Sequence, residues 1–94
     1  MPVGLIHCKI LIPDCRSLKE KRGRLKPLLY KIHKKFNVSV SEMDDLDLWN
    51  QTSISCAVIT NKHVFSEKLL QNIVSFIEED FQDLQIINYE IEIF

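Results

Sequence analysis

The 94 residues, 46% of them hydrophobic, allow one domain with one core and exclude a chain of several domains. Only two glycines and three prolines are present, which excludes a disordered or low-complexity chain. The net charge of -1 hides an uneven distribution: nine of the 12 Lys and Arg residues lie between residues 16 and 35, whereas residues 42–47 and 78–83 are acidic.

The three cysteines, Cys8, Cys15 and Cys56, are odd in number and form no C-x-x-C motif. Neither a disulfide framework nor a metal site is therefore predicted, and Cys8 and Cys56 are expected to be buried reduced thiols. The N-terminal residues do not have the pattern of a secretory signal, and no apolar run approaches the roughly 18 residues that span a membrane. We expect a cytoplasmic protein that does not contact membranes.

The first predicted element is a strand at residues 3–12, because apolar side chains recur at every second position. The face expected to be buried holds Ile6, Cys8, Ile10 and Ile12. Pro13 ends the strand because it has no N–H to donate. The capping box Ser17-Leu18-Lys19-Glu20 then starts a helix that is predicted to reach about Phe36.

An apolar stripe follows this predicted helix at a spacing of about 100° per residue. It consists of Leu18, Leu25, Leu28, Leu29, Ile32 and Phe36. Pro27 lies inside the helix, where we expect a kink, and Gly23 leaves room for it. Asn37 is predicted to end the helix in the left-handed conformation.

A second strand is predicted at residues 38–43, an acidic turn at 44–50 and a third strand, rich in β-branched residues, at 52–60. A second helix is expected at about 62–80, capped by Asn61, and a last strand at 85–94.

This β-α-β-β-α-β order predicts a ferredoxin-like α+β domain over residues 1–94, with a four-stranded antiparallel sheet and two helices on one face. The first and last strands are neighbours in that fold, so Lys9 is expected to pair with Glu90 or Glu92 on the open face of the sheet.

Three segments, RSLKEKR at residues 16–22, FNVSVSE at 36–42 and DDLDLW at 44–49, together resemble the YlxP-like family of small bacterial proteins, a domain of unknown function. The resemblance covers nearly the whole chain and implies a ferredoxin-like fold. The family's genes commonly lie beside those of a translation initiation factor and a ribosome-binding factor, which implies a role in ribosome assembly or translation. The chain departs from the family at Pro27, where the helix is usually unbroken, and at Asn50, where glutamine is more usual.

Clustered cations on the first helix predict a surface that contacts RNA phosphates. The candidate contacts are Arg16, Lys19, Arg22, Arg24 and Lys26, extended by Lys31, Lys34 and Lys35. Glu20 is the only acidic residue in this segment, so the positive charge is expected to stay unneutralised. A solvated helix face whose lysine stems cover the core edge is the main alternative, and an acidic protein surface is another. Base stacking of the RRM type is excluded because the two central strands lack aromatic residues.

Acidic residues dominate the turn between the second and third strands, where Asp44, Asp45, Asp47 and Trp49 are candidates for a partner-binding site. The turn lacks the glycine and the distal glutamate of an EF-hand loop, so no metal is predicted, and an ordinary solvated turn is the alternative. Trp49 is expected either to anchor the turn on the edge of the core or to contribute to partner binding.

No motif of a catalytic site is present, because His7, His33 and His63 are scattered and no glycine-rich phosphate loop occurs. No catalytic residue, cofactor or small-molecule substrate is therefore predicted. Apolar residues expected on the open sheet face, Leu5, Leu11, Ile86 and Phe94, allow a homodimer. The leading hypothesis is a non-enzymatic factor that binds structured RNA or a ribosomal particle; the alternative is a protein-interaction module that uses the open sheet face, Trp49 and the acidic turn.

Overall fold

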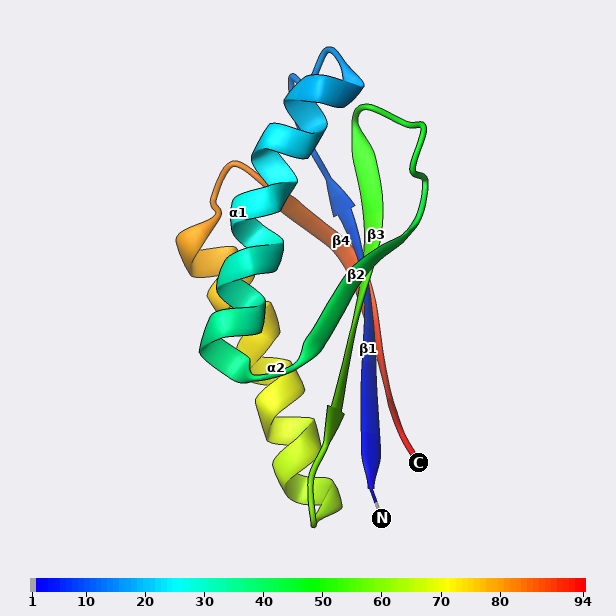
Figure 1. The fold of residues 1–94 in the computed structure, drawn as a ribbon, viewed down its shortest axis with the longest axis vertical. Coiled ribbons are helices and arrows are strands. Elements are labelled where there is room, and N and C mark those ends of the chain that lie inside the picture. Colours follow the sequence, from blue (N-terminus) through cyan, green and yellow to red (C-terminus); the bar gives the residue numbers. More distant parts are fainter. Residues whose placement is uncertain (1) are drawn as a thin grey trace.

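The computed structural model describes residues 2–94 and contains one sheet with two helices against one of its faces (Figure 1). In chain order the elements are β1 (Val3–Leu11), α1 (Leu18–Phe36), β2 (Ser39–Asp44), β3 (Gln51–Ile59), α2 (His63–Asp80) and β4 (Gln85–Ile93). All neighbouring strands are antiparallel, in the order β2-β3-β1-β4. This confirms the predicted ferredoxin-like architecture. Neither helix combines the length and the hydropathy that crossing a lipid bilayer takes.

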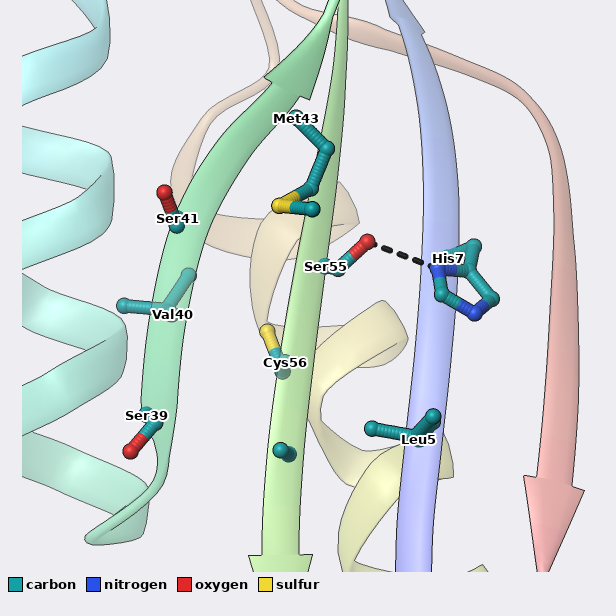
Figure 2. A pocket seen from close by; sticks show the side chains of 9 residues that line it. Leu5, His7, Ser39, Val40, Ser41, Met43, Ser55 and Cys56 are labelled. Carbon is teal, nitrogen blue, oxygen red and sulfur yellow. Dashed lines mark hydrogen bonds between the residues drawn. The ribbon is translucent and has the colours of Figure 1, made fainter.

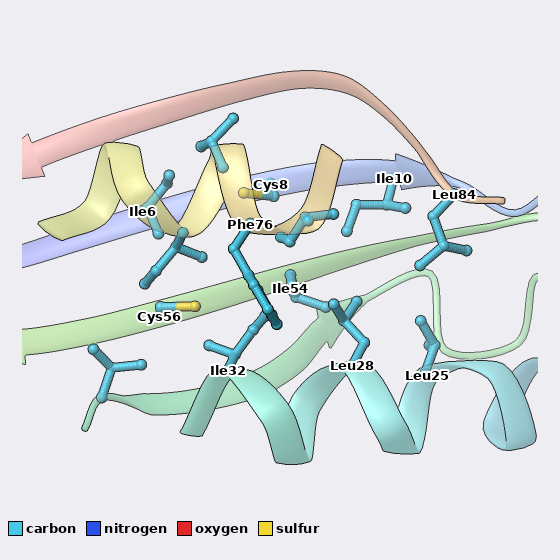
Figure 3. Close-up of a cluster of buried hydrophobic side chains, with 14 of the residues drawn as sticks. Ile6, Cys8, Ile10, Leu25, Leu28, Ile32, Ile54, Cys56, Phe76 and Leu84 are labelled. Atoms are coloured by element: carbon cyan, nitrogen blue, oxygen red, sulfur yellow. The ribbon is translucent and has the colours of Figure 1, made fainter. Parts of the chain in front are cut away.

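The core lies between the sheet and the two helices (Figure 3). The face of β1 that was predicted to be buried, with Ile6, Cys8 and Ile10, forms part of it. Side chains of the central strands meet the apolar stripes of α1 and α2; the best buried include Ile6, Ile10, Leu28, Ile32, Ile54, Leu70, Ile73 and Ile77. Cys8 and Cys56 are buried free thiols, as expected. Burial raises the pKa of each of these two thiols to about 12, which keeps them protonated and unreactive at neutral pH.

The predicted capping box starts α1 with one change of partner. The Ser17 hydroxyl accepts the N–H of Glu20 at 3.0 Å, as expected. The Glu20 carboxylate accepts the N–H of Arg16 at 2.6 Å, one residue before the usual partner. Together these bonds satisfy two donors at the entrance of the helix.

The helix then continues through Pro27 to Phe36 as one element. Asn37 ends it in the left-handed conformation, with φ at 50°, and its N–H donates to the carbonyl of His33. The helix end is therefore placed as the sequence predicted.

Asn61 does not cap α2, so this prediction was wrong. The residue in the capping position is Lys62, whose side chain makes no capping hydrogen bond. The Thr60 hydroxyl instead donates to the carbonyl of Lys62 at 2.7 Å and lies 2.6 Å from the hydroxyl of Ser66. A threonine directly after β3 therefore organises the turn into the helix.

An extra residue in β4 moves one predicted side chain to the other face of the sheet. Lys9 pairs with Asn88, but Ile10 pairs with Ile86, so Ile87 has no partner on β1. Because Ile10 faces the helices, Ile86 packs against the core and not on the open face. Its predicted place on the open face was wrong.

Candidate nucleic-acid interface

Five of the eight predicted cationic contacts lie on the solvent side of α1 or just before it. We call this set the cationic ridge, and it consists of Arg16, Lys19, Arg22, Lys26 and Lys34. Steps of three or four residues bring successive side chains to the same side of a helix. All five residues are exposed, and no ion pair within residues 2–94 involves any of them. Their positive charge is therefore directed to solvent.

Arg24 is half-buried and its guanidinium is held by contacts within the protein. Its guanidinium donates to the carbonyl of Pro13 at 2.6 Å and to the carbonyl of Asp83 at 3.0 Å. It also forms an ion pair with the Asp83 carboxylate at 3.2 Å. The expectation that only Glu20 could neutralise charge on this helix was therefore wrong, and we leave Arg24 out of the ridge.

Lys21 has a structural role that was not predicted from the sequence. Its side chain is buried, with a residue exposure of 1%. The ammonium group lies 2.9 Å from a carboxylate oxygen of Glu42 and donates to the carbonyl of Asp45 at 2.7 Å. The Thr52 hydroxyl donates to the same Glu42 oxygen at 2.6 Å. We call this group of contacts the Lys21 latch, because it joins α1 to the end of β2.

A signal for the burial of Lys21 is present in the sequence. Lys21 precedes Leu25 by four residues and Leu28 by seven, which is the spacing of the buried stripe. A lysine at the centre of such a stripe needs a carboxylate or carbonyl partner, because an unpaired buried charge is strongly destabilising.

The remaining two candidates, Lys31 and Lys35, lie on the α2 side of α1. The Lys31 ammonium is 5.4 Å from the ring centroid of Phe81, and that of Lys35 is 4.8 Å from the ring centroid of Phe76. These cation–π contacts hold both side chains but leave their charge in place. Lys31 and Lys35 therefore extend the positive potential around the helix without belonging to the ridge.

The β2–β3 loop exposes three apolar side chains at one end of the molecule. Leu46, Leu48 and Trp49 are 57%, 44% and 52% exposed. Trp49 is therefore partly covered by the fold and presents a large part of its surface to solvent. Asp44 and Asp47 are exposed beside these side chains, so the loop surface is both apolar and acidic.

Hydrogen bonds hold the base of this loop in place. Asp45 has a positive φ of 62°, and its carboxylate accepts from the Gln51 amide at 2.9 Å. The N–H of Ile12 donates to the carbonyl of Asn50 at 2.7 Å. Of the predicted partner residues, Asp45 thus supports the loop, whereas Asp44, Asp47 and Trp49 are presented to solvent.

The open face of the sheet is more polar than predicted. His7 Nδ1 lies 2.7 Å from the Ser55 hydroxyl, and Figure 2 shows this pair beside a hollow whose lining includes Leu5 and Met43. His7 also pairs in register with Glu90, while Ser55 pairs with Ser41 on β2. A polar row thus crosses all four strands at the centre of this face.

The prediction that Lys9 pairs with Glu90 or Glu92 was wrong, since its neighbour on β4 is Asn88 and no ion pair of residues 2–94 involves Lys9.

No cluster of three His, Cys, Asp or Glu side chains in the described chain is arranged to hold a metal ion.

Comparison with known proteins gives one family and one fold. A family model described as "Protein of unknown function (DUF503)" matches residues 3–91. The "Uncharacterized protein YlxP" of Bacillus subtilis (strain 168) is 42% identical to this chain over 76 residues, which cover 81% of this chain and 83% of that protein.

Similar solved structures share only the architecture. A de novo designed protein with a ferredoxin fold, LFR1 1, has a TM-score of 0.56 at 14% identity, covering 100% of this chain and 84% of its own. MupZ from Pseudomonas fluorescens has a TM-score of 0.58 at 14% identity, with 95% and 69% covered. SnoaB from Streptomyces nogalater, a cofactor-independent oxygenase, has a TM-score of 0.51 at 8% identity, with 99% and 90% covered. One fold with such different members indicates no particular activity.

Proposed function

This chain belongs to the DUF503 family, and we propose that it is a non-enzymatic factor that binds structured RNA, free or in a ribosomal particle, through the cationic ridge of α1. The observation that carries the proposal is the set of five exposed Lys and Arg side chains without an ion-pair partner within residues 2–94. Cations in this state can replace the counterions of a phosphate backbone without first breaking an internal ion pair. The link to ribosome assembly or translation depends on the resemblance to the YlxP-like family.

The length of the ridge suits a phosphate backbone. Lys19 and Lys34 are 15 residues apart, which corresponds to about 22 Å along an α-helix. A stretch of this length meets several phosphates, and Lys and Arg hydrogen-bond them without reading base identity. Helical RNA is recognised largely by its shape and its phosphates, because side chains do not enter its narrow major groove.

The two carboxylates that reach α1 from other parts of the chain as ion-pair partners do not cancel this surface. Glu42 pairs with the buried Lys21, and Asp83 pairs with Arg24. Both carboxylates are thus engaged by cations outside the ridge. The ridge keeps a local positive potential although the net charge of the chain is -1.

Affinity for an RNA hairpin, measured by fluorescence anisotropy between about 50 and 200 mM salt, tests the proposal. On duplexes the logarithm of the binding constant falls with the logarithm of the salt concentration by about 0.9 per neutralised phosphate. The Arg22→Ala/Lys26→Ala variant should weaken binding for all sequences and reduce this slope by about 2.

The matched control is Lys62→Ala/Lys68→Ala, which removes the same charge from exposed positions at and near the start of α2. This control should bind RNA much as the unaltered protein does. Binding that does not change with salt, or an equal loss in the two double variants, would contradict the role of the ridge.

A protein-interaction module is the second candidate function, favoured by the exposed Leu46, Leu48 and Trp49 on the acidic β2–β3 loop. An exposed tryptophan among apolar neighbours is typical of a binding hot spot. Light scattering measures whether the chain forms a homodimer, through this loop or the open sheet face. A monomeric mass that Trp49→Ala leaves unchanged would contradict self-association.

A further inference from the structure

We infer that Tyr30 is a stacking platform for an unpaired RNA base, so that the cationic ridge prefers RNA with a single-stranded nucleotide beside a helical segment. This inference rests on the proposed function and specifies the class of RNA that the ridge binds. It starts from the position of Tyr30, four residues after Lys26 and four before Lys34. These steps place the ring on the same side of α1 as the two lysines.

The ring of Tyr30 does not pack against the core, and its contact within the fold is with the Lys34 ammonium on the surface of α1. The residue is 62% exposed and does not belong to the side chains that pack against the core. No hydrogen bond of residues 2–94 involves its hydroxyl group. Tyrosine is also a weaker helix former than lysine or alanine. Neither packing nor helix propensity therefore accounts for an aromatic residue at this position.

The turn before Tyr30 leaves its ring accessible. Helical side chains lean toward the N-terminus, so the Tyr30 side chain covers the turn that contains Pro27. Pro27 and Gly23, three and seven residues before Tyr30, are both exposed and carry no long side chain. A Cβ atom added to Gly23 would meet nothing within 4 Å. Gly23 and Pro27 thus form a shelf without charged side chains next to Tyr30, bordered by the ridge residues Lys19 and Lys26.

Positive charge borders this shelf where a stacked nucleotide would place its phosphates. The Lys34 ammonium is 5.7 Å from the centroid of the Tyr30 ring, and Lys26 lies one turn before it. A base on the ring can therefore have its flanking phosphates bound by lysines within one helical turn. Aromatic rings and cations arranged in this way bind single strands with little sequence preference, because every base has a π-face.

The exposed Trp49 is a poorer platform for a base. Trp49 lies in the β2–β3 loop beside Asp44 and Asp47, whose carboxylates repel phosphates.

Bases inside a duplex are stacked on each other and cannot reach Tyr30. The RNA must therefore offer a bulged or looped nucleotide next to its helical backbone.

Two RNAs with the same stem, one fully paired and one with a single-nucleotide bulge, test the inference by anisotropy. The unaltered protein should bind the bulged RNA more tightly. Tyr30→Ala should weaken binding of the bulged RNA by about 5- to 150-fold and leave binding of the paired RNA unchanged. Tyr30→Phe keeps the ring and should retain the preference. A 2-aminopurine base at the bulge should be quenched by the unaltered protein and by Tyr30→Phe, but not by Tyr30→Ala.

Lys26→Ala serves as the charge control and should weaken binding of both RNAs with a lower salt slope. Equal binding of the two RNAs by the unaltered protein, or an equal effect of Tyr30→Ala on both, would overturn the inference and leave the proposed function standing. If the unaltered protein binds neither RNA, the proposed function fails as well. Because Tyr30 is exposed, circular dichroism should show that its variants stay folded.

Discussion

Replacement of Lys21 by methionine should destabilise the protein more than any other single charge removal on α1. The side chain of Lys21 is 2% exposed and that of its partner Glu42 is 21% exposed. Breaking a buried ion pair from one side costs about 3–5 kcal/mol, because it leaves an uncompensated charge. In Lys21→Met, Glu42 keeps its hydrogen bond from Thr52 and part of its contact with water. We therefore expect the loss of the ion pair to lower the free energy of unfolding by about 2–3 kcal/mol.

The same substitution leaves the Asp45 carbonyl without its donor, which adds about 1 kcal/mol. A total of about 3–4 kcal/mol is a large part of the roughly 5–15 kcal/mol that stabilises a small domain. Urea denaturation followed by circular dichroism measures the loss. Lys19→Met, two residues away on the exposed side of α1, is the matched control and should change the free energy of unfolding by less than about 0.5 kcal/mol.

A double-mutant cycle with Lys21→Met and Glu42→Gln separates the ion pair from the other contacts of Lys21. Glutamine keeps an acceptor for the Thr52 hydroxyl and removes the charge. We expect a coupling energy of about 1–3 kcal/mol. Because Trp49 is the single tryptophan and lies in the loop that the Lys21 latch holds, acrylamide should quench its fluorescence more in Lys21→Met. Stability within about 0.5 kcal/mol of the unaltered protein, with no coupling, would refute this reasoning.

Replacing each of the two glycines by alanine should change the stability in opposite directions, as measured by thermal unfolding. A Cβ at Gly4 would lie 3.0 Å from an α2 side chain, so Gly4→Ala should lower the free energy of unfolding by about 1–3 kcal/mol. Gly23 lies on the open surface of α1, so Gly23→Ala should raise the free energy of unfolding by about 0.5–1 kcal/mol, and a decrease would contradict the open geometry. Ser17→Ala removes the cap of α1 and should cost about 1 kcal/mol, and an unchanged melting temperature would count against the capping hydrogen bond. Since burial raises the pKa of Cys8 and Cys56 from 9.0 to about 12, the unfolded chain loses these protons first, and the free energy of unfolding should fall as the pH rises from about 9 toward 12. A Cys8→Ala/Cys56→Ala variant should lack this part of the decline in urea titrations, and an identical decline would contradict it.

The predicted elements could be recognised because their signals are local. Alternation of Ile6, Cys8 and Ile10, the capping box at Ser17 and the αL residue Asn37 each depend on neighbours within about one helical turn or one strand. All three were confirmed in the structure. The β-α-β-β-α-β order then leaves few arrangements for two helices and one sheet, since crossover connections are right-handed. The fold class and the core faces of β1 and α1 were therefore determined by the sequence alone.

The state of each charge was decided only by tertiary packing. Lys21 and the carbonyl of Asp45 are 24 residues apart, and Arg24 and Asp83 are 59 residues apart. No local pattern identifies such partners, because they meet only after β2 and the end of α2 pack beside α1. The face of Ile86 depends in the same way on the extra residue in the pairing of β4 with β1. The sequence of α1 is cationic along its length, but in the folded protein the helix has the Lys21 latch on its buried side and the cationic ridge on its exposed side. A buried charge needs a partner to offset the loss of its hydration, whereas a charge in solvent does not.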